Sequence, residues 1–193
     1  MKKIAMLHTS SATLAMMQQL IADIMPEVEV MHLVEESMIK QVMKAGGVTP
    51  NIAARIADYV HIAEKADCDI FITACSSIGT AVEQCQFLTP LQLARIDSAM
   101  VKEAIEKGER IAVLATVATT LKPTLDYVQR KIQESGKPRA VTPILMEEAF
   151  HALLAGEMDT HDRIVADGLK TAFSQADVVM LAQASMARVL QQL

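Results

Sequence analysis

The sequence predicts an α/β protein built as two similar lobes. Each lobe is expected to be a parallel sheet flanked by helices, and the lobes to be related by a pseudo-twofold axis with the functional site in the cleft between them. Two observations carry this prediction. Short apolar runs alternate with helix-length amphipathic segments, as in βαβ units. A stretch near the N-terminus also recurs 107 residues later in the 193-residue chain.

The composition is that of a well-packed globular protein. Hydrophobic residues make up 51% of the chain and charged residues 21%, which suits a sizeable core and argues against extensive disorder. Aromatic residues contribute only 3%, so the thirteen methionines are expected to fill much of the core.

The first half shows four strand-like and four helix-like segments. Strands are expected at residues 4–7, 28–34, 69–74 and 91–96, and helices at 12–25, 35–45, 50–66 and 79–88. Pro26 stops the first helix, and Gly46-Gly47 ends the second. Thr49 and Pro50 are typical of an N-cap and a first helical position.

The second half repeats this alternation. Strands are expected at residues 111–114, 140–145 and 177–182, and helices at 98–107, 120–134, across 146–174, and at the C-terminus. We therefore predict a first lobe from residues 1–97 plus 186–193 and a second lobe from residues 98–185.

The two halves also match residue by residue. Residues 4–14 align with 111–121 at an offset of 107, with six identities, and residues 69–77 align with 177–185 at an offset of 108, with three. Two blocks in the same order at nearly the same offset indicate a duplication. The period is too long for a solenoid.

Polar loops follow the predicted strands where ligands bind in open α/β sheets, beyond the carboxyl ends of the strands. These loops are residues 8–11, 75–79, 115–120 and 183–187. They are rich in Ser and Thr, and each opens a helix, an arrangement that suits an anion. Each loop alone is equally consistent with ordinary N-capping, but four together favour a carboxylate or phosphate site.

The cysteines differ in their surroundings. Their number is odd and none has zinc spacing, so neither a disulfide framework nor a metal site is expected. Cys68 and Cys85 lie in core-like segments. Cys75 closes an apolar strand and is followed at once by Ser76 and Ser77.

The segment Ile72-Thr73-Ala74-Cys75-Ser76-Ser77 resembles the first catalytic motif of the aspartate/glutamate/hydantoin racemase family. Further stretches resemble that family in the same order: His8-Thr9-Ser10, Arg95-Ile96-Asp97, Leu114-Ala115-Thr116 and Leu181-Ala182-Gln183-Ala184-Ser185-Met186-Ala187. The resemblance implies a cofactor-independent enzyme that acts on a small carboxylate or amino acid. It also implies two cysteines on opposite faces of the substrate α-carbon, one removing a proton and the other delivering one.

The sequence departs from the family pattern at the second cysteine. The repeat mate of Cys75 is Gln183, and no cysteine follows Cys85. A glutamine side chain does not remove a proton from carbon. Three functions therefore stay open: a racemase/isomerase-type enzyme working through Cys75, a single-cysteine lyase such as a decarboxylase of a malonate-type acid, and a non-catalytic carboxylate-binding relative. In the decarboxylases the retained cysteine resembles the position of Gln183.

Candidate site residues follow from the loops and the resemblance. Cys75 is the catalytic candidate. The substrate-binding candidates are Ser10, Ser11, Ser76, Ser77, Thr116, Thr119, Thr120, Gln183 and Ser185. His8 and Asp97 are possible auxiliary residues, with structural hydrogen bonding and helix capping as their alternatives. His161 and Asp162 are expected to serve in capping and at the surface, and no Arg is expected at a strand end to select a second carboxylate.

Charge and hydropathy limit the partners. The net charge is −5 with no Lys/Arg cluster, so no nucleic-acid partner is expected. No apolar run approaches the ~18 residues of a membrane span. The apolar run before His8 is too short for a signal peptide, which predicts a cytoplasmic protein. A homodimer is the default expectation for a soluble enzyme.

Overall fold

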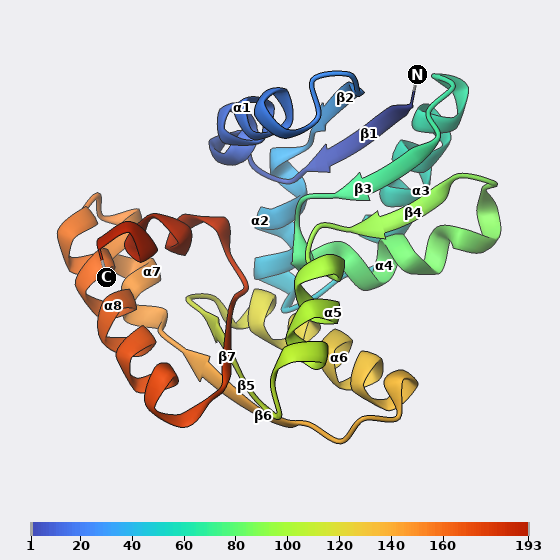
Figure 1. The fold of residues 1–193 in the computed structure, drawn as a ribbon. Helices are drawn as coiled ribbons and strands as arrows, with labels where there is room; N and C mark the ends of the chain where they lie inside the picture. Colours follow the sequence, from blue (N-terminus) through green and yellow to red (C-terminus); the bar gives the residue numbers. More distant parts are fainter. Residues whose placement is uncertain (1, 193) are drawn as a thin grey trace. The chain divides into compact units, whose positions relative to one another are not determined.

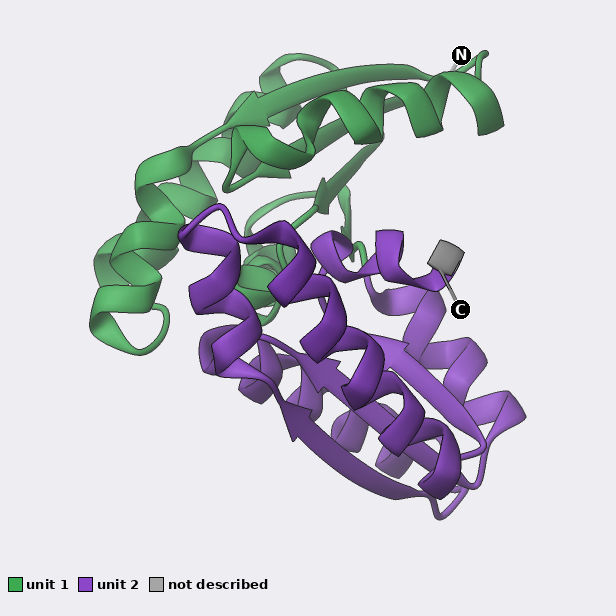
Figure 2. Cartoon of the chain, turned by 90° about the vertical axis from the view of Figure 1, so that its left-hand side faces the viewer, with its two compact units in different colours: residues 1–96 green, residues 97–193 purple. Residues whose placement is uncertain are grey.

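The computed structural model describes residues 2–192. The chain divides into two compact units, residues 1–96 and residues 97–193 (Figures 1 and 2). Each unit has its own sheet with helices beside it, and all strand pairs in both sheets are parallel. The predicted class, two parallel sheets flanked by helices, is confirmed.

The first unit has a four-stranded sheet in the order β2-β1-β3-β4. Its strands are β1 (Lys3–His8), β2 (Glu29–Val34), β3 (Ile70–Thr73) and β4 (Gln92–Arg95). Its longer helices are α1 (Leu14–Ile24), α2 (Glu36–Ala45), α3 (Pro50–Lys65) and α4 (Gly79–Gln84). Short 3-10 turns η1 (Ser11–Thr13), η2 (Ser76–Ile78) and η3 (Cys85–Leu88) flank α1 and α4. The segments predicted from periodicity agree with these bounds to within a few residues.

Local chemistry explains where α2 and α3 end and begin. Gly46 follows α2 with a φ of 72°, a left-handed conformation that glycine adopts without steric cost. The Thr49 hydroxyl accepts a hydrogen bond from the Ile52 N–H, and Pro50 occupies the first helical position of α3. The predicted N-cap is therefore confirmed.

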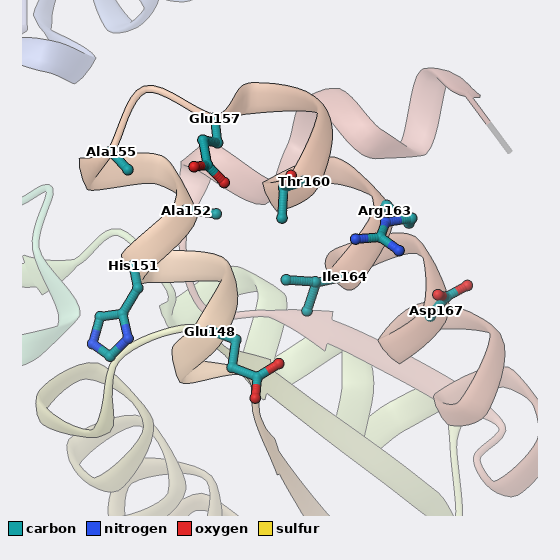
Figure 3. Close-up of a pocket in the computed structure, with 9 residues that line it drawn as sticks. All are labelled: Glu148, His151, Ala152, Ala155, Glu157, Thr160, Arg163, Ile164 and Asp167. Carbon is teal, nitrogen blue, oxygen red and sulfur yellow. The ribbon is translucent and has the colours of Figure 1, made fainter.

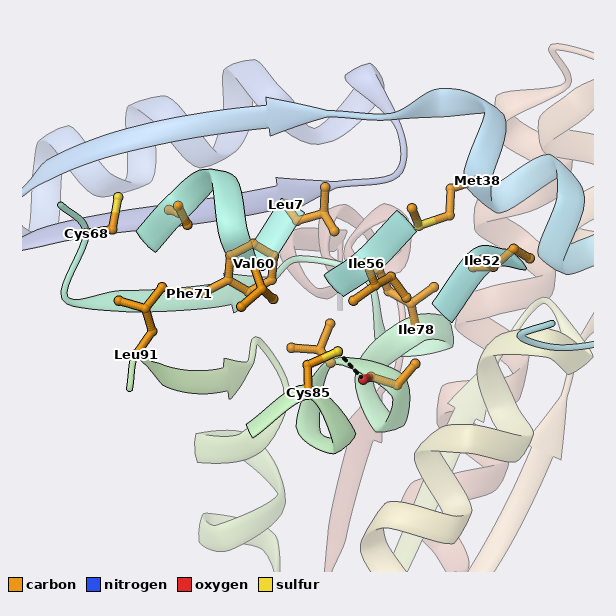
Figure 4. Packing of buried hydrophobic residues seen from close by; sticks show 14 of the residues in the cluster. Leu7, Met38, Ile52, Ile56, Val60, Cys68, Phe71, Ile78, Cys85 and Leu91 are labelled. Carbon is orange, nitrogen blue, oxygen red and sulfur yellow. Dashed lines mark hydrogen bonds between the residues drawn. The ribbon is translucent and has the colours of Figure 1, made fainter. Parts of the chain in front are cut away.

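The core of the first unit lies between the sheet and α3 (Figure 4). Helix α3 buries Ile52, Ile56 and Val60, which recur at every fourth position and so share one face. They pack in one cluster with Leu7 of β1 and with Phe71, at the centre of β3. This packing fixes the carboxyl ends of β1 and β3, where the predicted site loops begin.

The second unit has a three-stranded sheet in the order β6-β5-β7. Its strands are β5 (Arg110–Ala115), β6 (Ala140–Leu145) and β7 (Val178–Leu181). Its helices are α5 (Ser98–Lys107), α6 (Ala118–Ser135), α7 (Glu147–Leu154), α8 (Met158–Gln175) and the 3-10 segment η4 (Ala184–Gln192). The region 146–174, predicted as helical, is thus divided into α7 and α8.

The C-terminal segment differs from its prediction. We assigned residues 186–193 to the first lobe, but the structure groups residues 97–193 in one unit. Met186 and Val189 are fully buried in a cluster with Leu114 of β5 and Leu169 of α8. The apolar side of η4 therefore covers its own half's sheet.

The two sheets have corresponding strand orders, as the predicted duplication implies. Strands β2, β1 and β3 of the first unit are adjacent in the same order as β6, β5 and β7 of the second. The aligned aspartates also behave alike. Asp69 accepts a hydrogen bond from the backbone N–H of Lys3, and Asp177 from that of Arg110, so each braces the start of its central strand.

Candidate active site

Cys75 lies just beyond the carboxyl end of β3, at the start of η2. Its backbone is fixed by Thr73, whose hydroxyl accepts from the Cys75 N–H at 3.1 Å and donates to the Cys75 carbonyl at 3.2 Å. Its side chain is partly buried against the core of the first unit. The backbone is thus held rigidly while the thiol keeps some exposure.

The other two cysteines are buried, as the sequence predicts. Burial raises the pKa of the Cys68 thiol, and it raises the pKa of the Cys85 thiol as well. The Cys85 thiol also donates to the Ala81 carbonyl within α4 (Figure 4). Both residues therefore have structural surroundings, and Cys75 is the most accessible of the three thiols.

Ser76 and Ser77 follow Cys75 in η2, and both are buried. Sequence reasoning missed the residue beneath this turn. Arg95 ends β4 and is 1% exposed, and its guanidinium lies so close to Gly79 that a Cβ there would come within 2.5 Å of Cζ. An Arg therefore does end a strand, but what its guanidinium meets is α4. Arg95 packs under the helix that follows Cys75, with Glu83 Oε2 3.7 Å from Nη1.

The loop after β1 is engaged in local hydrogen bonds. The Ser10 hydroxyl accepts from the Ala12 N–H and so caps η1. Ser11 donates both its N–H and its hydroxyl to Glu36 Oε1, and these hydrogen bonds lower the pKa of the Glu36 carboxyl. The structure thus supports the capping alternative for Ser10, whereas Ser11 is held by Glu36.

His8 is buried at the end of β1. Its Nε2 lies 2.9 Å from Nδ1 of His32 on the neighbouring strand β2. Its other ring nitrogen is buried without a hydrogen-bond partner among residues 2–192. Side chains alternate along a strand, so His8 points to the sheet face opposite Leu7, whereas Cys75 packs against the cluster that contains Leu7. The structure therefore pairs His8 with His32 rather than with the thiol.

Gln183, the repeat mate of Cys75, follows β7 in the second unit. Its Oε1 accepts from the Thr116 backbone N–H at 2.6 Å and from the Thr116 hydroxyl at 3.1 Å. Thr116 is itself fully buried after β5. The structure thus brings together these two predicted residues at one edge of the sheet.

The remaining candidates in the second unit lie at helix starts. Thr119 and Thr120 are in the first turn of α6, and the Thr119 hydroxyl is buried with no hydrogen-bond partner among the described residues. Ser185 is partly buried in η4. Asp97 is buried at the N-cap position of α5, but its side chain makes no capping hydrogen bond.

His161 and Asp162 are not the surface pair that we predicted. Both are buried, and His161 Nδ1 lies 2.8 Å from Asp162 Oδ1. Arg188 of η4 donates from Nε and Nη2 to the two carboxylate oxygens of Asp162, at 2.9 and 2.6 Å. The pair is buried because this ion pair draws η4 onto the first turn of α8.

A cavity of about 560 Å³ lies between α7 and α8, away from the predicted residues (Figure 3). Glu148, Glu157 and Asp167 contribute carboxylates to it, and Arg163 contributes a positive charge. Neither Cys75 nor Gln183 lines this cavity. It is therefore separate from the candidate active-site residues.

Two further features bear on the class of protein. Among residues 2–192, no three or more His, Cys, Asp or Glu side chains gather in an arrangement that would hold a metal ion. Within the same residues, no helix has both the length and the apolar character of a membrane span.

Comparison with known proteins identifies relatives of this chain. The family model described as Asp/Glu/Hydantoin racemase matches residues 4–193. A search of curated proteins finds no match.

Solved structures share the fold. Glutamate racemase from Aquifex pyrophilus is 19% identical, with a TM-score of 0.67, over 97% of this chain and 76% of that one. An aspartate racemase homologue from Pyrococcus horikoshii is 16% identical, with a TM-score of 0.72, over 98% and 88%. Allantoin racemase from Klebsiella pneumoniae is 13% identical, with a TM-score of 0.63, over 100% and 78%.

Proposed function

Because the chain belongs to the Asp/Glu/hydantoin racemase family, we propose that it is a cofactor-independent enzyme acting at the α-carbon of a small carboxylate or amino acid. Cys75 is the proposed acid/base. The observation that carries this assignment is its place: a partly exposed thiol on a fixed backbone at the carboxyl end of a central strand. The buried Cys68 and Cys85 lack that access.

Removal of the α-proton requires a base, and it requires hydrogen-bond donors to the substrate carboxylate. A Cys75 thiolate removes the α-proton and becomes a thiol, and the electron pair of the broken C–H bond moves onto the carboxylate oxygens. Donors that meet this developing charge lower the barrier. We assign this donor role to the predicted residues that share the first unit with Cys75 and whose hydroxyls are not donated to Glu36, namely Ser10, Ser76 and Ser77.

Because Cys75 is the one catalytic candidate among the three cysteines, a second function, that of a lyase, is also favoured. Decarboxylation of a malonate-type acid releases carbon dioxide and adds only one proton, so one thiol suffices. Cys75 would then deliver that proton as a general acid. A carboxylate-binding protein without turnover is the third possibility, and it predicts that loss of Cys75 removes no activity.

The test is proton NMR of candidate amino acids and small diacids incubated with the protein in D₂O. Wild type is compared with Cys75→Ala and with Cys85→Ser, which keeps a hydrogen-bond donor to the Ala81 carbonyl and serves as the matched control. We expect loss of an α-proton signal with wild type and Cys85→Ser, and no loss with Cys75→Ala. Chiral analysis of the product then separates racemisation from one-sided exchange.

The other outcomes assign the function differently. A new product one carboxylate shorter, formed only when Cys75 is present, identifies the lyase. Binding of a carboxylate without exchange or product in any variant identifies the binding protein. Equal exchange by wild type and Cys75→Ala removes Cys75 from the mechanism.

A further inference from the structure

We propose that the cavity between α7 and α8 binds a basic amino acid of the lysine or ornithine type. Glu148 and Glu157 each bind one ammonium group of this ligand, and Arg163 binds its carboxylate. The cavity lies wholly within the second unit, and neither Cys75 nor Gln183 lines it. This inference therefore stands apart from the proposed function and does not depend on it.

The cavity has the size and the floor of a small-molecule site. Its volume of about 560 Å³ lies within the roughly 300–1,000 Å³ of typical ligand pockets. Ala152 and Ile164 form an apolar stretch between its two ends (Figure 3). Ala152 is buried and Ile164 is partly buried. The methylene chain of a ligand can therefore lie against this stretch while its polar groups reach the charged rim.

Glutamates lie at opposite ends of the apolar stretch. Glu157 lies beside Ala155, where the chain passes from α7 to α8, and Glu148 lies at the other end, in the first turn of α7 (Figure 3). Glu148 and Ala155 are seven positions apart, which is two helical turns or about 10 Å along α7. Neither glutamate side chain has a hydrogen bond or an ion pair within the described part of the chain. This separation suits a ligand with an ammonium group at each end of an apolar chain.

Arg163 contributes a positive charge from the α8 side of the cavity. The acid one turn further along α8, Asp167, accepts a hydrogen bond from Lys170 Nζ at 3.1 Å instead. Arg163 has no hydrogen bond or ion pair of its own among the described residues. A guanidinium presents a planar fork of N–H donors that matches a carboxylate. The free guanidinium therefore favours a ligand that carries a carboxylate as well as its two ammonium groups.

The balance of charge distinguishes between classes of small molecule. The carboxylates of Glu148, Glu157 and Asp167 outnumber the guanidinium of Arg163, so the cavity favours a ligand with a net positive charge. A dicarboxylate is repelled, a neutral amino acid lacks the second ammonium group, and a diamine has no partner for the guanidinium. A basic amino acid supplies a partner for every group.

Binding of three small molecules to the full chain tests this assignment. Isothermal titration calorimetry is carried into the millimolar range with lysine, with norleucine, which lacks the side-chain ammonium group, and with cadaverine, which lacks the carboxylate. We expect lysine to bind roughly threefold more tightly than either analogue, because each analogue loses a partly exposed ion pair. Equal affinity for lysine and norleucine, equal affinity for lysine and cadaverine, or no binding of lysine overturns the inference.

Glu148→Gln has a matched control in Glu147→Gln. Both glutamates lie in the first turn of α7 and both are exposed, but Glu147 does not line the cavity. Each substitution removes a similar interaction with the helix dipole, so a difference between them reports on the cavity. We expect the Kd of lysine to rise about three- to fivefold in Glu148→Gln and in Arg163→Gln, and to stay unchanged in Glu147→Gln. The same Kd in Glu148→Gln and Glu147→Gln contradicts the assignment.

Two further measurements locate the bound lysine. Hydrogen exchange followed by mass spectrometry should slow in α7 and α8 when lysine is added, and stay unchanged in β1 and β3. Cys75→Ala should bind lysine as wild type does. Protection of β1 and β3, or a weaker Kd in Cys75→Ala, would place lysine at the candidate active site and overturn this inference, while leaving the proposed function intact.

Discussion

His8 makes the stability of the protein sensitive to acid. Burial, and secondly the charge of the neighbouring His32, lower the pKa of His8 to about 4. Between pH 6.5 and 4 the unfolded chain therefore binds more protons than the folded one, so stability is lost as the pH falls through this window. The loss attributable to His8 is roughly 2–3 kcal/mol near pH 4, and nothing above pH 7.

Urea unfolding between pH 4 and 7.5 measures this loss. We expect His8→Gln, which keeps a donor near His32 Nδ1, to be less sensitive to acid than wild type in this range. Replacing the exposed His61 with Gln should leave the wild-type slope unchanged. Parallel stability curves for wild type and His8→Gln would contradict the prediction.

For single residues, the sequence predicted which side chains are accessible better than it predicted how they are oriented. Cys75 could be separated from Cys68 and Cys85 because strand ends and core segments differ in their apolar patterns. The orientation of the Gln183 amide could not be predicted, because it depends on a hydrogen bond to Thr116, 67 positions away. The burial of His161 was missed because the Arg188 ion pair that draws η4 onto α8 has no local sequence signature.

Helix α4 and strand β4 pack closely enough that a single methyl group should separate them. A Cβ on Gly79 would lie 2.5 Å from Arg95 Cζ, and Arg95 is buried and has little room to move. We expect Gly79→Ala to lower the free energy of unfolding by about 1–3 kcal/mol, as overpacking does. Because α4 follows Cys75, exchange activity should fall as well.

Gly47→Ala is the matched control for this prediction. No atom lies within 4 Å of a Cβ built at Gly47, so this variant should unfold at a similar urea concentration to wild type. Equal midpoints for Gly79→Ala and Gly47→Ala would show that Arg95 yields, and that the contact does not hold α4 in place.

Elements were predicted well because their signals are local. The apolar face of α3, the Thr49 cap and the alternation of strands with helices all lie within short windows of sequence. The Arg95 contact with α4 brings together residues that are 16 positions apart, and the pattern of either segment gives no sign of it. The same limit explains the misplaced C-terminal segment, whose periodicity reveals an apolar side but not the surface that it covers.

The two units have separate cores, so we expect a substitution in one core to destabilise that unit more than the other. Phe71 is fully buried in the cluster of the first unit, which contains no residue of the second. We expect Phe71→Ala to destabilise the first unit by about 3–5 kcal/mol, because it leaves a cavity. Hydrogen exchange followed by mass spectrometry should show faster exchange in β1, β3 and α3 than in β5 and α8.

A matched variant in the second unit completes the test. Leu169→Ala removes a fully buried side chain of α8 and should reverse the pattern, with faster exchange in the second unit. If either variant accelerated exchange equally throughout the chain, the two units would unfold as one cooperative body, contrary to the prediction.

The matching hydrogen bonds of Asp69 and Asp177 point to a common ancestor of the two halves. Each secures the same strand junction in its own half, so the ancestral half already carried this solution before its gene was copied. An ancestor encoded by the single gene would have had one residue where this chain has both Cys75 and Gln183. Joining the copies in one reading frame freed these positions to diverge, and they now hold a thiol in one half and an amide in the other.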